Sequence, residues 1–196
     1  AALAAEDTGS FNTAVGFSAL NSLNFDGSGH NVAVGYNAGV FVSTGVNNTL
    51  IGSLAGDALT TGSENVAVGK SALSNEDGGS GNIAIGFAAL GTLNAGADGY
   101  NVGIGRSAGA AMTTGLYNTV IGGFTGDALT TGSNNVAIGY AALSTEDAHG
   151  RNVAIGAYAL QDQDAGADAY NIAIGYETGK NVTTGSSNTL IGGLSG

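Results

Sequence analysis

A five-residue pattern of small and β-branched apolar residues, bracketed by Asn and Gly, recurs along the chain. "NVAIG" occupies residues 135–139 and again 152–156, and close variants are NTAVG, NVAVG and NIAIG. Its Asn stands at positions 12, 31, 48, 65, 82, 101, 118, 135, 152, 171 and 188, at spacings of 17 or 19 residues. Four spacings span the 70 residues from Asn12 to Asn82, and the motifs recur with that period. The chain therefore consists of short repeats nested in a longer repeat of four.

Each motif has the composition of a short strand that ends in a bend. The second residue is Thr, Val or Ile and the fourth is Val or Ile, types that favour strands. Gly always follows, which is typical of a sharp bend, and so many Gly disfavour a helix. The bends are expected at Gly35, Gly52, Gly69, Gly86, Gly105, Gly122, Gly139, Gly156 and Gly175.

A coil this short cannot bury its own apolar side chains, so neighbouring coils must stack. The sequence therefore predicts an all-β fold, a parallel β-solenoid (β-roll) of about eleven coils of 17–19 residues in a 70-residue super-repeat. At the spacing of neighbouring strands this gives a rod roughly 50 Å long.

The third motif residue is apolar where a polar residue would be expected. Side chains alternate along a strand, so we expect the β-branched second and fourth residues to fill the coil interior and the third to face outward. That third residue is nevertheless Ala in most motifs and Gly, Val or Leu in the others. A strand that is apolar on both faces is typically buried on both. The pattern predicts a homo-oligomer that covers the outer face, and an exposed row of Ala is the alternative.

The Asn residues allow two structural interpretations. Stacked Asn side chains form hydrogen-bonded ladders, and Asn is also a common turn former before a strand. The candidate ladder consists of Asn31, Asn48, Asn65, Asn82, Asn101, Asn118, Asn135, Asn152 and Asn171.

Composition excludes several classes of partner. The 196 residues include 15 acidic and only 4 basic side chains, for a net charge of −11, which argues against binding to nucleic acid or anionic lipid. No uninterrupted apolar run is long enough for membrane insertion of this segment. With no Cys, thiolate metal sites and disulfides are excluded.

The stretches NTAVGFSAL, NVAVGYNAG, NIAIGFAAL and NVAIGYAAL resemble the head repeats of YadA-type trimeric autotransporter adhesins. They are similar also to the NTAIG-type repeats of phage and bacterial tail-fibre-like proteins. The resemblance covers about half of the chain and implies a trimeric β-roll in an adhesin head or tail-fibre stalk, placed outside the cell, on its surface or in a virion fibre. A host or cell-surface receptor is then the expected partner.

The repeat register predicts that residues 1–196 are one repetitive domain within a longer repeat protein. "AALAAEDTGS" at the start aligns with "AALSTEDAHG" at 141–150, so the chain opens in mid-coil. The final "IGGLSG" aligns with "IGGFTG" at 121–126. A subunit that stacks end to end into an extracellular filament is an alternative, because terminal strands are templates for further pairing.

The turns between motifs contain the candidate ligand-binding residues. Some coils have Thr-Gly turns and others have acidic pairs, namely Glu6-Asp7, Glu76-Asp77 and Glu146-Asp147. Acidic turns rich in oxygen ligands suit Ca²⁺, and "QDQDAGADAY" offers Asp162, Asp164 and Asp168. We nevertheless expect these turns to be solvated loops that maintain solubility, with no cofactor, and Ca²⁺ binding is the alternative.

We predict no enzymatic activity. The two histidines, His30 and His149, stand in unlike turns, and Tyr occupies the position of His30 in later repeats, so His30 is expected to stack at the surface. Aromatic residues follow many of the bends and offer a groove for a glycan or receptor, or else fill the bends between coils; they are Phe17, Tyr36, Phe87, Tyr140 and Tyr176.

Overall fold

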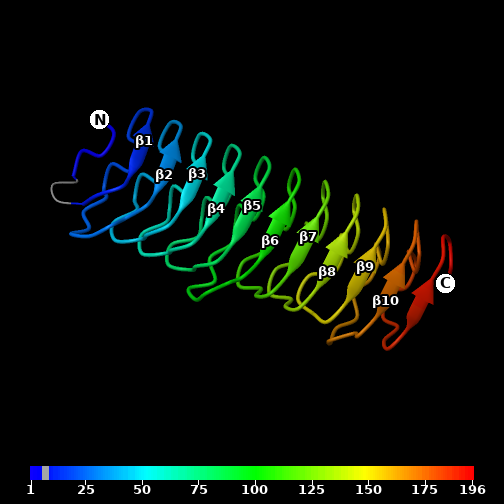
Figure 1. Cartoon of the computed structure of the whole chain (residues 1–196). Helices are drawn as coiled ribbons and strands as arrows, with labels where there is room; N and C mark the ends of the chain where they lie inside the picture. The colour runs from blue at the N-terminus through cyan, green and yellow to red at the C-terminus, as the bar shows by residue number, and fades with distance from the viewer. Residues whose placement is uncertain (6–8) are drawn as a thin grey trace.

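The chain folds as a single stack of parallel strands, one from each coil (Figure 1). The structure is a computed structural model that describes residues 1–5 and 9–196. Within these residues it contains eleven strands of three residues each and no helix. The strands are β1 (Thr13–Val15), β2 (Val32–Val34), β3 (Thr49–Ile51), β4 (Val66–Val68), β5 (Ile83–Ile85), β6 (Val102–Ile104), β7 (Thr119–Ile121), β8 (Val136–Ile138), β9 (Val153–Ile155), β10 (Ile172–Ile174) and β11 (Thr189–Ile191).

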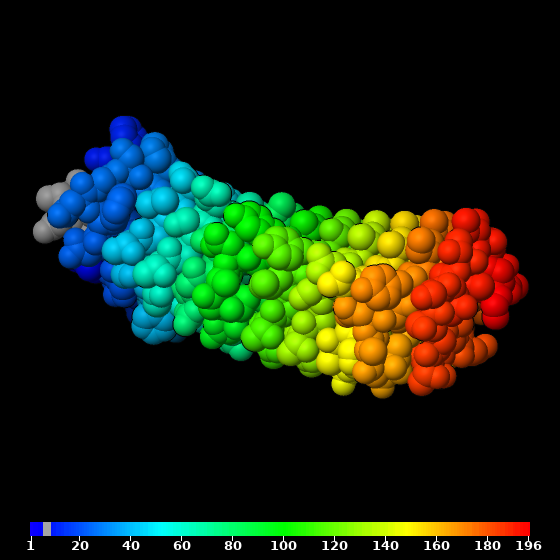
Figure 2. Space-filling model, turned by 90° about the horizontal axis from the view of Figure 1, so that it is seen from below, coloured from blue at the N-terminus to red at the C-terminus, as the bar shows by residue number. Residues whose placement is uncertain are grey.

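Adjacent coils stack with their motifs in register. Val32, at the second motif position, pairs with Thr49 at the same position in the next coil, and the same register holds from β1 to β11. Backbone hydrogen bonds join the coils outside the strands as well: the Leu73 amide donates to the Ala89 carbonyl at 3.0 Å. The coils form an elongated rod (Figure 2). The predicted all-β parallel solenoid is therefore confirmed.

The expected orientation of the strand side chains is wrong. The third motif residue points into the coil, and Ala33, Ala67 and Ala137 have no exposed surface in the single chain. The second and fourth residues face outward: Ile85 is 37% exposed and Ile51 39% exposed. The third residue is thus small because the coil interior is thin, so its apolar character gives no evidence for a partner chain. On the strands, the apolar residues available to a partner are the β-branched ones.

Large and small side chains alternate across this thin core. Leu90 fills the space opposite Gly103, where an added Cβ would lie 2.6 Å from the Leu90 Cγ. Conversely, Leu50 on β3 faces Gly39 and Gly56, and a Cβ on Gly39 would lie 2.6 Å from a Leu50 methyl. At these positions Gly on one wall makes room for Leu on the other, which keeps the packing dense without widening the coil.

The Gly that ends each motif is required by backbone conformation and by space. At Gly69, φ is +134°, a region that side chains of L-residues rarely adopt. A Cβ there would lie 2.5 Å from the carbonyl oxygen of Gly86, the equivalent Gly of the next coil. The Gly column thus lets the bends stack at the strand spacing.

Residues 1–5 and 9–196 contain no helix of the length and apolarity needed to cross a bilayer.

Candidate functional site

The outward side chains of the sheet form two adjacent columns that run the length of the rod. We call this surface the outer sheet face. One column consists of the second motif residues, Thr13, Val32, Thr49, Val66, Ile83, Val102, Thr119, Val136, Val153, Ile172 and Thr189. The other consists of the fourth residues, Val15, Val34, Ile51, Val68, Ile85, Ile104, Ile121, Ile138, Ile155, Ile174 and Ile191.

Neither column of this face contains a charged side chain, and all residues are Val or Ile except for Thr at four of the second positions. Eleven strands at a spacing of about 4.8 Å and three residues of width give a strip of about 50 by 10 Å, or about 500 Å². Contiguous apolar patches of that size on soluble chains commonly mark interaction sites. The outer sheet face is therefore a candidate site for protein association that runs the length of the rod.

A second surface feature is a row of rings and cations beside the bends, which we call the aromatic ladder. It contains Phe87, Arg106, Phe124, Tyr140, Tyr158 and Tyr176. The Arg106 guanidinium lies 5.7 Å from the ring centre of Phe87 and 5.6 Å from that of Phe124. Beyond Phe124 the rings meet edge to face at 5.5–6.3 Å. Three of the five aromatics predicted from the sequence belong to this ladder.

The other two predicted aromatics, Phe17 and Tyr36, stack on each other near the N-terminal end, with ring centres 5.5 Å apart. They are 66% and 54% exposed, so these rings cover the outside of the bends. His30 stacks on Phe11 at 5.1 Å with nearly parallel rings, in agreement with the surface stacking expected for it.

The motif Asn residues form one buried column, and nine of them have no exposed surface: Asn31, Asn48, Asn65, Asn82, Asn101, Asn118, Asn135, Asn152 and Asn171. The backbone amide of each donates to the side-chain Oδ1 of the preceding Asn at 2.9–3.2 Å. In the 17-residue coils, Nδ2 donates to a backbone carbonyl 14 residues later, as from Asn118 to Gly132 at 2.8 Å. The column thus combines a ladder between coils with a turn cap within each coil.

The 19-residue coils interrupt this capping. Asn82 Nδ2 donates instead to Ser80 and Asn65, at 3.4 and 3.3 Å. Asn152 Nδ2 is buried without a hydrogen-bond partner among the described residues. The longer coils therefore interrupt the regular capping by the Asn column.

The described acidic turns combine exposed and buried carboxylates, so only part of each turn is the solvated loop expected from the sequence. Glu76 and Glu146 are fully buried, whereas Glu6 and Asp7 lie outside the described residues. The two buried Glu occupy a core column eleven residues after the motif Asn, whose other fully buried members are Leu23, Val42, Leu59, Leu93, Met112, Leu129 and Gln163. Each Glu therefore extends inward, and only the adjoining Asp faces solvent.

The two buried Glu differ in how their carboxylates are satisfied. Glu76 accepts hydrogen bonds at both oxygens, from the Gly79 amide at 2.8 Å and the Ala95 amide at 3.1 Å. Glu146 Oε1 accepts from the His149 amide at 3.1 Å and lies 3.1 Å from His149 Nδ1. Its Oε2 is buried and has no hydrogen-bond partner in the part of the chain that the structure describes.

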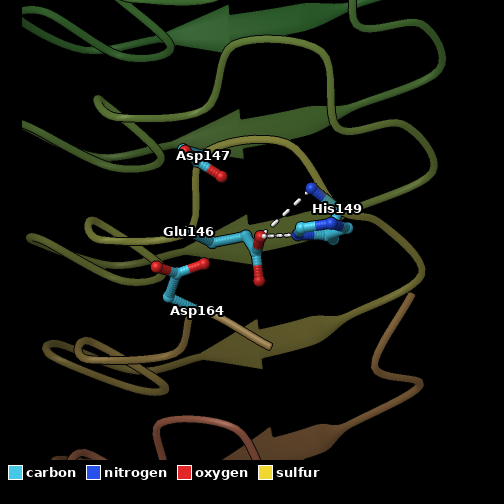
Figure 3. Close-up of side chains that lie close together, drawn as sticks. All are labelled: Glu146, Asp147, His149 and Asp164. Carbon is cyan, nitrogen blue, oxygen red and sulfur yellow. Dashed lines mark hydrogen bonds and ion pairs between the residues drawn. The ribbon is translucent and has the colours of Figure 1, made fainter. Parts of the chain in front are cut away.

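Around Glu146 the chain gathers several potential metal ligands. Glu146, Asp147, His149 and Asp164 each offer one ligand atom, and these atoms lie within 4.8 Å of one another. Figure 3 shows the carboxyl group of Glu146 between His149 on one side and Asp147 and Asp164 on the other. We call these four residues the carboxylate–histidine cluster.

The three predicted ligands Asp162, Asp164 and Asp168 have different surroundings. Asp164 belongs to the cluster, and Asp162 and Asp168 do not. Asp168 instead accepts from Arg151 Nε at 2.7 Å and from the Gly150 amide at 3.0 Å. The contributions of Glu146 and His149 were missed because an acidic pair and a lone His are typical of solvated turns.

Two further carboxyl groups are perturbed. Burial raises the pKa of Asp57 and of its repeat equivalent Asp127, partly offset by a hydrogen bond from each residue's own backbone amide. In both residues Oδ1 is buried, with no hydrogen-bond partner in the described ranges 1–5 and 9–196.

No family model, curated protein or solved structure matches this chain.

Proposed function

We propose that this chain is the structural rod of an extracellular fibre, an adhesin head or tail-fibre stalk, that self-associates through its outer sheet face and catalyses no reaction. The observation that carries this proposal is the continuous β-branched surface on one side of the rod. An in-register column of Val and Ile matches the same column on a second copy, because every coil presents the same motif at the same spacing.

A homotrimer is the proposed assembly. The number of copies and the extracellular setting rest on the resemblance of the repeats to trimeric adhesin heads and tail-fibre repeats. Packing outer sheet faces around a threefold axis would bury one apolar strip per chain and leave the turns and the aromatic ladder in solvent, available to a host or cell-surface receptor.

The test places a charge in the middle of the outer sheet face. Ile85→Lys puts an ammonium on β5, where the side chain is 37% exposed in the single chain, so the isolated rod should tolerate it. In the assembly the charge would be desolvated, and we expect self-association to weaken by at least about 100-fold. Thr61→Lys, at an exposed turn, is the matched control with the same added charge.

The readout is molar mass by light scattering after size exclusion. The wild type and Thr61→Lys should run at three times the chain mass of 18.9 kDa, and Ile85→Lys as a monomer. A monomeric wild type contradicts the proposal. Open-ended growth with concentration, unaffected by Ile85→Lys, supports an end-to-end filament instead.

A glycan-binding module is the second candidate, favoured by the aromatic ladder. Phe87, Tyr140 and Tyr176 of the ladder are exposed, and such rings on a rigid support offer the apolar faces that sugar rings pack against. Arg106 adds hydrogen-bond donors. A glycan-array signal that Tyr140→Ala abolishes, and that Tyr100→Ala outside the ladder leaves intact, would support this function. Loss of signal in neither variant would exclude the ladder as the binding surface.

A further inference from the structure

We propose that Glu146, Asp147, His149 and Asp164 bind one divalent transition-metal ion of the Zn²⁺ class, which fastens two neighbouring coils together. This site is independent of the self-association proposed above. Glu146, Asp147 and His149 come from the turn after β8, and Asp164 comes from the turn after β9, one coil further along the rod.

The four ligand atoms already converge. They lie within 4.8 Å of one another, and in a tetrahedral zinc site ligand atoms stand about 3.4 Å apart. The ligand atoms must therefore move closer together to bind the ion. Asp147 and Asp164 are exposed and His149 is partly exposed, so their side chains can make this movement. These residues also leave the cluster open to an ion from solvent.

The buried carboxylate of Glu146 provides an independent indication of a ligand. A fully buried carboxylate oxygen without a hydrogen bond is costly, and Glu146 Oε2 has no hydrogen-bond partner among residues 1–5 and 9–196. Glu76, its equivalent 70 residues earlier, has both oxygens satisfied by backbone amides. The interior of the rod can therefore satisfy a buried Glu by itself, and at Glu146 it does not.

The negative charge of the cluster also favours a bound cation. Three carboxyl groups lie close together, and among the described residues the nearby cations have other anionic partners: Arg151 pairs with Asp168 and Lys180 with Glu177, at 2.7 and 3.5 Å. Within the cluster, the His149 ring is the group that can itself carry a positive charge. A divalent cation would therefore neutralise the negative charge of the carboxylates.

The donor set selects the metal. Ca²⁺ takes six to eight oxygen ligands, whereas this cluster offers three carboxylates and an imidazole. An imidazole with carboxylates in a four-ligand set suits Zn²⁺. The ligands differ from the Asp162, Asp164 and Asp168 set that suggested Ca²⁺ from the sequence, with only Asp164 in common.

The repeat provides a matched control. At the positions equivalent to His149 and Asp164 the preceding 70-residue unit has Gly79 and Asn94. The double variant His149→Gly/Asp164→Asn therefore converts the site into a version that the protein already folds. His30→Tyr, which installs the residue found at position 100, removes the other histidine.

The experiment measures Zn²⁺ binding by isothermal titration calorimetry on the full chain without a histidine tag, with Ca²⁺ titrated separately. We expect one Zn²⁺ per chain for the wild type and for His30→Tyr, and binding weakened by at least about 100-fold in the double variant. The melting temperature should rise on addition of Zn²⁺ in the wild type and in His30→Tyr, and it should stay unchanged in the double variant.

The absence of stoichiometric Zn²⁺ binding, or equal binding by the wild type and the double variant, would overturn the proposal. Tight Ca²⁺ binding without Zn²⁺ binding would also overturn it, because the imidazole would then have no role. Circular dichroism that matches the wild type establishes that the double variant is folded.

Discussion

Removal of one amide from the middle of the Asn ladder should open the rod locally. The substitution Asn118→Ala deletes Oδ1, which accepts a hydrogen bond from the Asn135 amide at 2.9 Å. It also deletes Nδ2, which donates to the Gly132 carbonyl at 2.8 Å. Both backbone groups then lie in the interior without their partners, since Asn118 has no exposed surface.

The magnitude follows from these two groups. A buried polar group deprived of its partner costs about 1–3 kcal/mol, so the pair costs about 2–6 kcal/mol. The lower end applies if a water molecule enters the space left by the amide. Asn181→Ala deletes the same amide from an exposed position and should change stability by less than about 0.5 kcal/mol.

Native-state hydrogen exchange is the appropriate assay, because stability in a repeat array is a sum of local terms between neighbouring coils. We expect the Asn135 amide and its coil neighbours to exchange about 30-fold faster or more, with amides near β2 and β3 unchanged. Unaltered exchange at Asn135 would refute a structural role for the ladder. A uniform acceleration along the chain would refute the coil-by-coil account of stability.

Three further substitutions test the stacked bends, the packing of the core and the raised pKa of Asp57. Gly69→Ala should lower the free energy of unfolding in urea far more than Gly96→Ala does. A Cβ at Gly69 would lie 2.5 Å from a backbone carbonyl oxygen, whereas no described atom lies within 4 Å of a Cβ at Gly96. Equal effects of the two substitutions would refute the argument that the bends stack too closely for a side chain. Leu90→Ala should cost about 2–5 kcal/mol in urea unfolding, as expected for a fully buried Leu, and a cost below about 1 kcal/mol would show a core that collapses freely. Burial raises the pKa of Asp57 in the folded chain, so the folded state holds that proton more tightly and stability falls as pH rises through the raised pKa. Asp57→Asn should therefore raise the urea midpoint relative to wild type at pH 7 and not at pH 3, and a gain of the same size at both values would contradict this assignment.

The periodicity of the sequence was sufficient to predict the coils, the strands and the bends. Asn at intervals of 17 or 19 residues and an invariant Gly leave few alternatives to stacked short strands, as at β8 and β9. The direction of the side chains could not be predicted in the same way, because alternation defines two faces without saying which is inside. The volume available inside the coil decides it, and the pairing of Leu50 with Gly56 was a signal of that volume.

The candidate metal ligands illustrate a second limit. Glu146 and Asp147 form an acidic pair that is typical of a solvated turn, and only the core column containing Leu59 and Leu129 shows that the Glu points inward. His149 and Asp164 come together because two coils stack in register, and their separation along the chain gives no hint of it. Asp168 has the same residue type as Asp164 but is taken up by Arg151.

The most direct test of the central claim, that Val and Ile face outward and are covered by another copy, is the relaxation of methyl protons by a paramagnetic cosolute. In the wild type, the methyls of Ile85 and Ile104 should be protected, as should the inward Ala84 methyl. In a chain made monomeric by Val68→Lys, the Ile methyls should relax strongly while that of Ala84 stays protected. Strong relaxation of Ile85 and Ile104 in the wild type would contradict a covered outer face. Strong relaxation of Ala84 in the monomer would contradict the orientation of the strands.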